Sequence, residues 1–130
     1  EHALKSYPDS YFIHSNAGYE YSARGETDNA MRRYSESLRL NPNYAQAHNG
    51  LGVELIKKGR TQEALERFTS ALRHKPDYAE AHCNLGARLA ALGKTDEAIS
   101  HFRTALKINP RDPQIHYDMG VALTKLGERK

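Results

Sequence analysis

The sequence predicts an all-α fold, a solenoid of antiparallel helix pairs packed side by side, and an internal repeat is the main reason. Residues 44–76 read YAQAHNGLGVELIKKGRTQEALERFTSALRHKP, and residues 78–110 read YAEAHCNLGARLAALGKTDEAISHFRTALKINP, 34 residues later. Prolines 42, 76 and 110 mark the same interval. A fixed period of this length indicates stacked supersecondary units that bury their apolar sides against their neighbours. An apolar content of 38% suits such layers better than one central core.

The period divides the chain into units that share residue types at the same positions. Full repeats span 11–44, 45–78 and 79–112. Residues 1–10 match the end of a truncated repeat, and 113–130 match the first helix of another. We therefore expect one domain over 1–130, taken from a longer array.

Each repeat should contain two helices, because two apolar-periodic runs are separated by a glycine. After a helix tail at 1–6, the predicted helices cover 11–24, 27–40, 45–58, 61–74, 79–92, 95–108 and 113–126. The glycines expected to end the first helix of each pair in a left-handed conformation are Gly25, Gly59, Gly93 and Gly127.

Polar residues at the predicted helix starts indicate caps. Threonines at 27, 61 and 95 can accept backbone hydrogen bonds at the start of the second helices. The pairs Asn43–Gln46 and Asp77–Glu80 have the spacing of a capping box. Asp9 or Ser10 can cap the first full helix, and Asp112 can cap the last, with Pro113 at its first position.

Small and aromatic residues alternate at fixed positions where the two helices of a repeat should cross. Glycines 18, 52 and 86 remove side-chain bulk, and Tyr34, Phe68 and Phe102 are placed to fill the space beside them. Glycine inside a helix costs about 1 kcal/mol relative to alanine, so its recurrence indicates a packing role.

These positions resemble the tetratricopeptide repeat. In the second repeat the matching residues are Leu51-Gly52, Leu55, Gly59, Ala64, Phe68, Ala71 and Pro76. The chain departs from the family at the fourth position, where His14, His48, His82 and His116 replace the usual aromatic. The resemblance implies a right-handed α-solenoid whose first helices line a concave groove.

The groove positions of the family, carried onto this chain, give a wall of amides and apolar side chains. The implied groove residues are Phe12, Asn16, Tyr19, Asn49, Val53, Lys57, Cys83, Asn84, Ala87 and Tyr117. Such a wall favours a protein–protein interaction scaffold that binds an extended or helical segment of another protein. An alternative for Phe12 and Tyr19 is that they cover an interface with a preceding repeat.

Two family subtypes offer narrower interpretations. Co-chaperone modules grip a C-terminal carboxylate with basic residues, but the equivalent positions here hold Ser15, Tyr19, Gly50, Glu80 and Asn84. No basic clamp is therefore expected. The chain also resembles arrays attached to O-linked N-acetylglucosamine transferase, which carry an asparagine ladder. Only residues 16 and 84 keep that ladder, while 50 and 118 break it. The alternative function is thus an acceptor-recruiting tail of a glycosyltransferase outside this fragment.

A third interpretation is self-association through terminal helices that have no cap. The last predicted helix has an apolar stripe at helical spacing and no second helix to cover it. The residues of this stripe are Ile115, Met119, Leu123 and Leu126.

The sequence shows no pattern that predicts catalysis, a metal or a cofactor. Equivalent histidines on stacked helices lie roughly 8–10 Å apart, so their row cannot converge on one ion. Cys83 has His82 only as an immediate neighbour, which faces elsewhere on a helix. With interspersed charges and a net charge of +3, nucleic acid is an unlikely partner. We expect no membrane span. The compartment stays open, with cytoplasmic as the default and a periplasmic or other extracytoplasmic location as the alternative.

Overall fold

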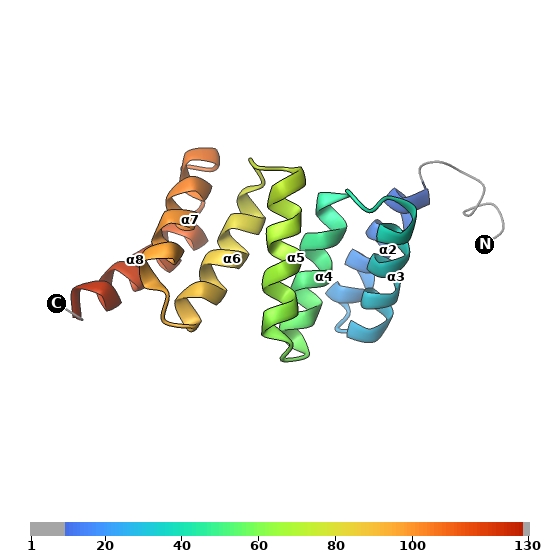
Figure 1. Cartoon of the computed structure of the whole chain (residues 1–130), viewed down its shortest axis with the longest axis horizontal. Coiled ribbons are helices and arrows are strands. Elements are labelled where there is room, and N and C mark those ends of the chain that lie inside the picture. The colour runs from blue at the N-terminus through green and yellow to red at the C-terminus, as the bar shows by residue number, and fades with distance from the viewer. Residues whose placement is uncertain (1–9, 129–130) are drawn as a thin grey trace. The chain divides into compact units, whose positions relative to one another are not determined.

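The computed structural model describes residues 10–128, and all regular structure within that range is helical. Figure 1 shows its seven helices in chain order. They are α2 (Ser10–Ala23), α3 (Thr27–Leu40), α4 (Ala45–Lys57), α5 (Thr61–His74), α6 (Ala79–Ala91), α7 (Thr95–Ile108) and α8 (Pro113–Glu128). Both ends of each helix lie within two residues of the predicted bounds. The helix tail predicted at 1–6 and the cap predicted at Asp9 lie outside the described residues.

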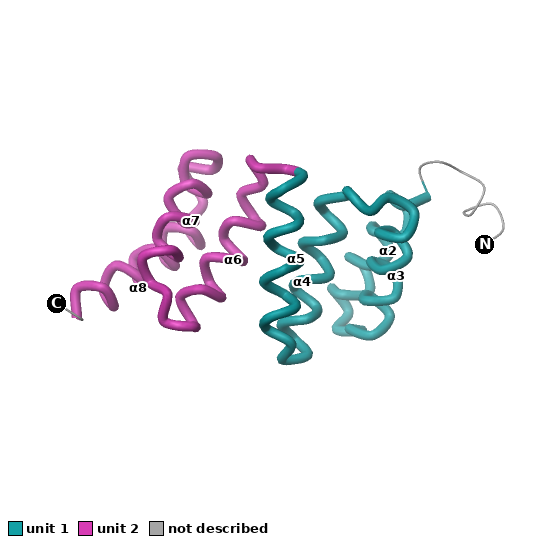
Figure 2. Tube along the Cα trace, in the orientation of Figure 1, with its two compact units in different colours: residues 1–74 teal, residues 75–130 magenta. Residues whose placement is uncertain are grey.

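The chain divides into two compact units, which Figure 2 shows in different colours. The first unit spans residues 1–74 and holds α2 to α5, in which α2 packs on α3, α4 on α5, and α3 and α2 on α4. The second unit spans residues 75–130, and there α7 packs on both α6 and α8. The organisation of 1–130 as one domain stays a prediction.

The turns inside the helix pairs depend on left-handed glycines. Gly25, Gly59 and Gly93 have φ angles of 78°, 77° and 84°. In the first pair, the amide of Glu26 donates to the carbonyl of Tyr21 at 2.9 Å, which is the Schellman arrangement. The prediction for Gly127 was wrong, because α8 continues through it to Glu128. Glycine permits a left-handed conformation without imposing one.

The predicted caps at Thr27 and Thr95 and the two predicted capping boxes are also wrong, whereas the cap at Thr61 stays a prediction. Thr27 and Thr95 are the first residues of α3 and α7, and the N-caps are Glu26 and Lys94, without a side-chain cap hydrogen bond. The glycine turns are tight enough that helical hydrogen bonding begins one residue earlier, from Ala30 to the carbonyl of Glu26. At α4 and α6 the N-caps are tyrosines 44 and 78, again without a side-chain bond.

The cap predicted for α8 is confirmed. The amide of Gln114 donates to Asp112 Oδ1 at 2.9 Å, and Pro113 is the first helical residue. Proline suits this position because its missing amide hydrogen has no helical partner there.

The core of the first unit is built where aromatic rings meet glycines. A Cβ added at Gly52 would lie 2.5 Å from Cε1 of Phe68, and one at Gly18 would lie 2.9 Å from the ring of Tyr34. Phe68 and Tyr34 are both buried. Gly50, which breaks the asparagine ladder, is also in close contact with the Tyr34 ring. Packing therefore explains why small residues occupy these positions.

The second unit repeats this contact once. A Cβ at Gly86 would lie 2.9 Å from Cε1 of Phe102, which is buried between α6 and α7. At Gly120, the equivalent position on α8, no described atom lies within 4 Å of an added Cβ. The predicted packing role of glycine is thus confirmed at the paired helices, and Gly120 provides an internal control.

Candidate functional site

In the first unit, α2 and α4 are joined by a polar contact beside the predicted groove face. Ser22 on α2 donates to Glu54 Oε2 on α4 at 2.5 Å, and Lys57 Nζ lies 3.4 Å from the same oxygen. Lys57 also donates to Ser22 Oγ at 3.0 Å. Glu54 is fully buried. A buried carboxylate needs such partners because burial removes its hydration, so this contact fixes α2 against α4.

The apolar members of this face are exposed to an unusual degree. Phe12 is 49% and Tyr19 is 70% exposed, whereas the aromatic rings of the core are buried. The ring of Phe12 lies edge-on to that of Tyr44, with centroids 6.5 Å apart. Asn16 is exposed near them on α2, and this end of the unit therefore presents aromatic area beside an amide.

The predicted groove residues of α4 differ in accessibility. Lys57 is exposed and Val53 is half-buried, so both are accessible. Asn49 is only 3% exposed and makes its interactions inside the helix packing. Asn49 therefore contributes to the packing of the helices and is not accessible to a ligand. The position in the repeat could not reveal this, since Gly50 beside it lets α4 approach Tyr34 closely.

In the second unit, the predicted residues lie on α6 and α8. Cys83, Asn84 and Ala87 of α6 are half-buried. Tyr117 on α8 is 68% exposed, and Val121, one turn further along α8, is also exposed. This second face thus presents one aromatic ring among small side chains. Like the face on α2 and α4, it is formed by the predicted groove positions of the repeat.

Cys83 is held by a carboxylate instead of being activated. Its Sγ lies 3.6 Å from Asp118 Oδ2 on α8. Burial, followed by the charge and the hydrogen bond of Asp118, raises the pKa of Cys83 to about 12. A nucleophilic cysteine needs the opposite, a lowered pKa that provides thiolate. The thiol therefore works here as a weak donor that links α6 to α8.

The histidines at the fourth repeat position form the histidine row, and three of them share a backbone contact that the sequence did not predict. Nε2 of His48, His82 and His116 lies 2.7–2.8 Å from the backbone carbonyl of Pro42, Pro76 and Pro110, respectively. A carbonyl only accepts, so Nε2 must carry the proton. Each histidine thus ties its helix start to the proline turn before it.

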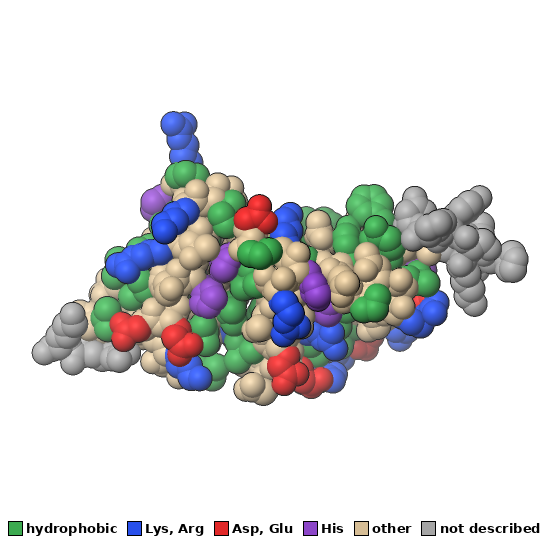
Figure 3. Space-filling model, turned by 45° about the horizontal axis from the view of Figure 1, so that its top comes forward, with side chains coloured by type: hydrophobic (Ala, Val, Ile, Leu, Met, Phe, Trp, Pro, Cys, Tyr) green, Lys and Arg blue, Asp and Glu red, His purple; other side chains and the backbone are tan. Residues whose placement is uncertain are grey.

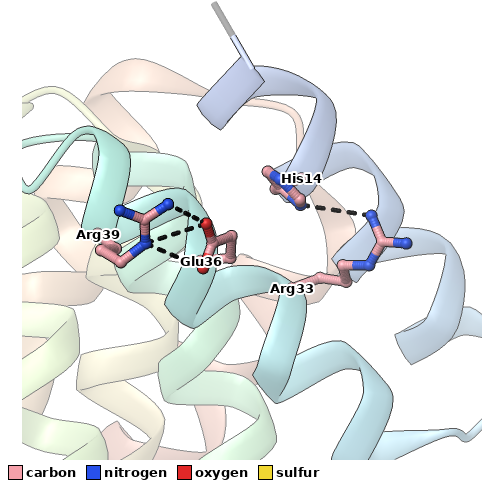
Figure 4. A network of polar contacts seen from close by, with 4 residues as sticks. All are labelled: His14, Arg33, Glu36 and Arg39. Atoms are coloured by element: carbon pink, nitrogen blue, oxygen red, sulfur yellow. Dashed lines mark hydrogen bonds and ion pairs between the residues drawn. The ribbon is translucent and has the colours of Figure 1, made fainter. Parts of the chain in front are cut away.

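The other ring nitrogen faces the second helix of the same repeat. His14 Nδ1 lies 3.3 Å from Arg33 Nη1, and His48 Nδ1 lies 3.3 Å from Arg67 Nη1. Figure 4 shows the first of these contacts, with the ion pair of Arg39 and Glu36 on the same helix as Arg33. In the neutral ring Nδ1 is an acceptor, and arginine supplies the donor.

The third repeat replaces that arginine with a histidine. His82 Nδ1 on α6 lies 3.0 Å from His101 Nδ1 on α7, and the ring centroids are 5.3 Å apart. Both side chains are half-buried, and histidine side chains reach the surface in Figure 3. The sequence contained a signal for this pair, because residues 33, 67 and 101 each follow a row histidine by 19 positions.

A small cavity of about 240 Å³ lies outside the predicted groove face. It is lined by Ala17, Glu20, Tyr21, Arg24 and Arg33. The guanidinium groups of both arginines lie about 6 Å or less from the centroid of the Tyr21 ring. In the second repeat the equivalent α4 positions, Leu51, Glu54 and Leu55, are buried within the first unit. This cavity therefore has the position of a contact surface between repeats.

The apolar stripe predicted for self-association is only partly open. Ile115 and Ala122 are buried within the second unit, where α8 packs on α7. Leu123 is exposed, while Met119 and Leu126 are half-buried. Ile115 is thus not available to a second copy, and self-association through the other three residues stays a prediction.

Within residues 10–128, no three His, Cys, Asp or Glu side chains converge as metal ligands. No helix in that range combines the length and hydropathy that crossing a membrane would require.

The family model described as TPR repeat matches residues 18–53, 54–92 and 87–127. These stretches cover most of the chain, so the protein belongs to the tetratricopeptide repeat family. The helices and their glycine–aromatic contacts agree with this membership. The comparison with curated proteins found no match.

Solved structures agree with the fold. The chain is similar to the first TPR domain of human RPAP3, with 18% identity, a TM-score of 0.86, and coverage of 94% of this chain and 96% of that one. The first TPR of Spaghetti (RPAP3) bound to the HSP90 peptide SRMEEVD has 18% identity, a TM-score of 0.85 and coverage of 90% and 95%. MamA has 23% identity, a TM-score of 0.83 and coverage of 96% and 73%. At these identities the likeness establishes the all-α repeat fold.

Proposed function

We propose that this protein is a non-catalytic scaffold that binds an extended segment of another protein on the groove face of its first helices. In the first unit this face is formed by α2 and α4, with Phe12, Asn16, Tyr19, Val53 and Lys57. In the second unit it is formed by α6 and α8, with Asn84, Ala87 and Tyr117. The observation that carries the proposal is the 70% exposure of Tyr19 on the same helix as the exposed ring of Phe12.

Exposed aromatic rings on a rigid helix suit peptide binding. They bury a large area when a ligand covers them, and they lose little conformational entropy because few torsions are free. The edge-on contact with Tyr44 already orients Phe12. Lys57 adds a cation at the edge of the same face, held near Glu54 and Ser22. The face is therefore preorganised for an apolar side chain with an acidic or carbonyl group nearby.

The proposed ligand differs from the acidic peptides bound by the TPR domains of RPAP3, which are SRMEEVD of HSP90 and SGPTIEEVD of HSP70. The positions that would form a carboxylate clamp hold no Lys or Arg in this chain, and Glu80 among them is exposed and acidic. We propose that binding depends on apolar side chains along the segment rather than on a free carboxyl terminus.

The test is selection of binders from a random peptide library displayed on phage, followed by affinity measurement with the synthetic peptides. The double variant Phe12→Ser/Tyr19→Ser should lose most of the affinity for peptides that occupy the first unit. The matched control is Leu92→Ser, which removes an equally exposed apolar side chain outside both faces. Unchanged affinity in the double variant, or the failure of any peptide to be enriched, would contradict the proposal.

A further inference from the structure

The contact between His82 and His101 is chemically different from its counterparts in the first unit. There, Nδ1 of the row histidine faces an arginine nitrogen, which is a permanent donor. In the second unit it faces another imidazole nitrogen at 3.0 Å. Two ring nitrogens at this distance need a proton or a metal ion between them, since two lone pairs repel each other.

The state of His82 is fixed by the backbone. Its Nε2 lies 2.8 Å from the carbonyl of Pro76, so the proton of the neutral ring is on Nε2 and the lone pair is on Nδ1. Histidines that bind metals almost always donate their second nitrogen to a carbonyl or a carboxylate in this way, which orients the ring and raises its basicity. His82 is therefore prepared to donate its lone pair to whatever lies between the rings.

We propose that His82 and His101 form a two-histidine chelate for a divalent transition-metal ion of the nickel or copper type. The ion would take the place of the single proton that the two Nδ1 atoms share in the neutral pair. The proton of the neutral His101 ring then lies on its Nε2.

The spacing favours these ions over zinc. With metal–nitrogen bonds of about 2.05 Å, two nitrogens 3.0 Å apart subtend an angle of about 94° at the ion. Ligands at right angles are found in the tetragonal geometry of Cu²⁺ and Ni²⁺, whereas zinc prefers the wider tetrahedral angle. Each ring turns its lone pair from the facing nitrogen toward the ion. No third side-chain ligand converges here among the described residues, so water fills the remaining positions.

The charges around the pair also suit a cation. Glu97, one turn before His101 on α7, is the charged side chain whose field acts on that ring. His48 in the first unit instead lies in the field of Arg67 and Arg73, which would repel an ion. The stacked pair of His48 and His74, with centroids 6.0 Å apart, is therefore not an equivalent site.

The experiment uses the tag-free chain with Ni²⁺ as the probe, because Ni²⁺ does not oxidise the thiol of Cys83. His101→Arg restores the residue type found at 33 and 67, so the α6–α7 pair should keep its fold while the chelate is lost. His74→Ala removes an exposed histidine outside the pair and is the matched control. Circular dichroism and thermal unfolding check the fold of each variant.

Calorimetric titration should show one saturable Ni²⁺ site in the wild type and in His74→Ala, and no such site in His101→Arg. In assigned NMR spectra, substoichiometric Ni²⁺ should broaden the ring resonances of His82 and His101 before those of the other histidines. Binding of equal strength in His101→Arg, first broadening at another histidine, or no saturable binding to the wild type would overturn the proposal. The NMR result decides even if the arginine variant does not fold.

Discussion

The α4–α5 pair and the α6–α7 pair are built on the same 34-residue pattern, yet they differ in their polar contacts. Both place a phenylalanine against a helix glycine, Phe68 on Gly52 and Phe102 on Gly86. Both tie a histidine to the preceding proline carbonyl. The difference is the residue facing that histidine, Arg67 in one pair and His101 in the other. The comparison shows that the phenylalanine–glycine contact is common to both helix pairs. The residue that faces the histidine differs between them, and so does the chemistry of that contact.

The largest expected effect is on stability, and it tests the phenylalanine–glycine contact that the two helix pairs share. Phe68→Ala and Phe102→Ala should each lower the free energy of unfolding by about 3–5 kcal/mol, because each leaves a cavity at a buried ring. Urea unfolding monitored by circular dichroism measures both losses. A large loss for one and a negligible loss for the other would show that the two pairs are not equivalent.

Replacing a helix glycine by alanine should change the stability by a smaller amount. The sign of the change should depend on whether an aromatic ring packs against the glycine. Gly52→Ala and Gly86→Ala should destabilise by about 1–3 kcal/mol, because the added Cβ overlaps a buried ring. Gly120→Ala should stabilise by up to about 1 kcal/mol, since its position is open and alanine favours the helix. Thermal unfolding measures all three. Stabilisation by alanine at 52 would be inconsistent with the packing described.

The histidines predict how stability depends on pH. Burial lowers the pKa of His48, with Arg67 and His74 acting in the same direction and the Pro42 carbonyl opposing them. Burial and His82 lower the pKa of His101, and Glu97 opposes them. The histidines of the unfolded chain have pKa values of about 6.5. As the pH falls, the unfolded chain therefore binds protons at a higher pH than the folded chain does. The stability from the neutral rings should be lost as pH falls from about 6.5 through the lowered values.

Urea unfolding between pH 7.5 and 5 tests this dependence. His101→Arg should give a shallower decline than the wild type, because one of the two groups with a lowered pKa is removed. A rise in stability on acidification, or an identical decline in the variant, would contradict the assignment.

The smallest expected effect concerns the thiol of the second unit. Because burial and Asp118 raise the pKa of Cys83 to about 12, alkylation by iodoacetamide at pH 8 should be slower than for a model thiol of pKa about 8.5. Asp118→Asn should accelerate it, since the charge that opposes the thiolate is removed. A rate in the wild type equal to that of the model thiol would show that Cys83 is not held as described.

The repeat period predicted most of the fold, because glycine turns and glycine–aromatic contacts recur wherever two helices of a repeat meet. It failed where the surroundings differ from one repeat to the next. Gly127 stays helical, and the N-caps of α3 and α7 lie one residue before the predicted threonines. Repeat position also placed Asn49 on the groove face, although its side chain is buried, next to the close contact of Gly50 with Tyr34. The pairing of His82 with His101 depends on two helices at once, and a search along one row of positions could not find it.

The most direct test of the account is to map a selected peptide onto the isotopically labelled protein by NMR. Binding on the groove face of the first helices predicts chemical-shift changes concentrated around Phe12, Tyr19 and Lys57 of the first unit, or around Asn84 and Tyr117 of the second. Changes centred instead on the second helices, α3, α5 or α7, would contradict the proposed binding face.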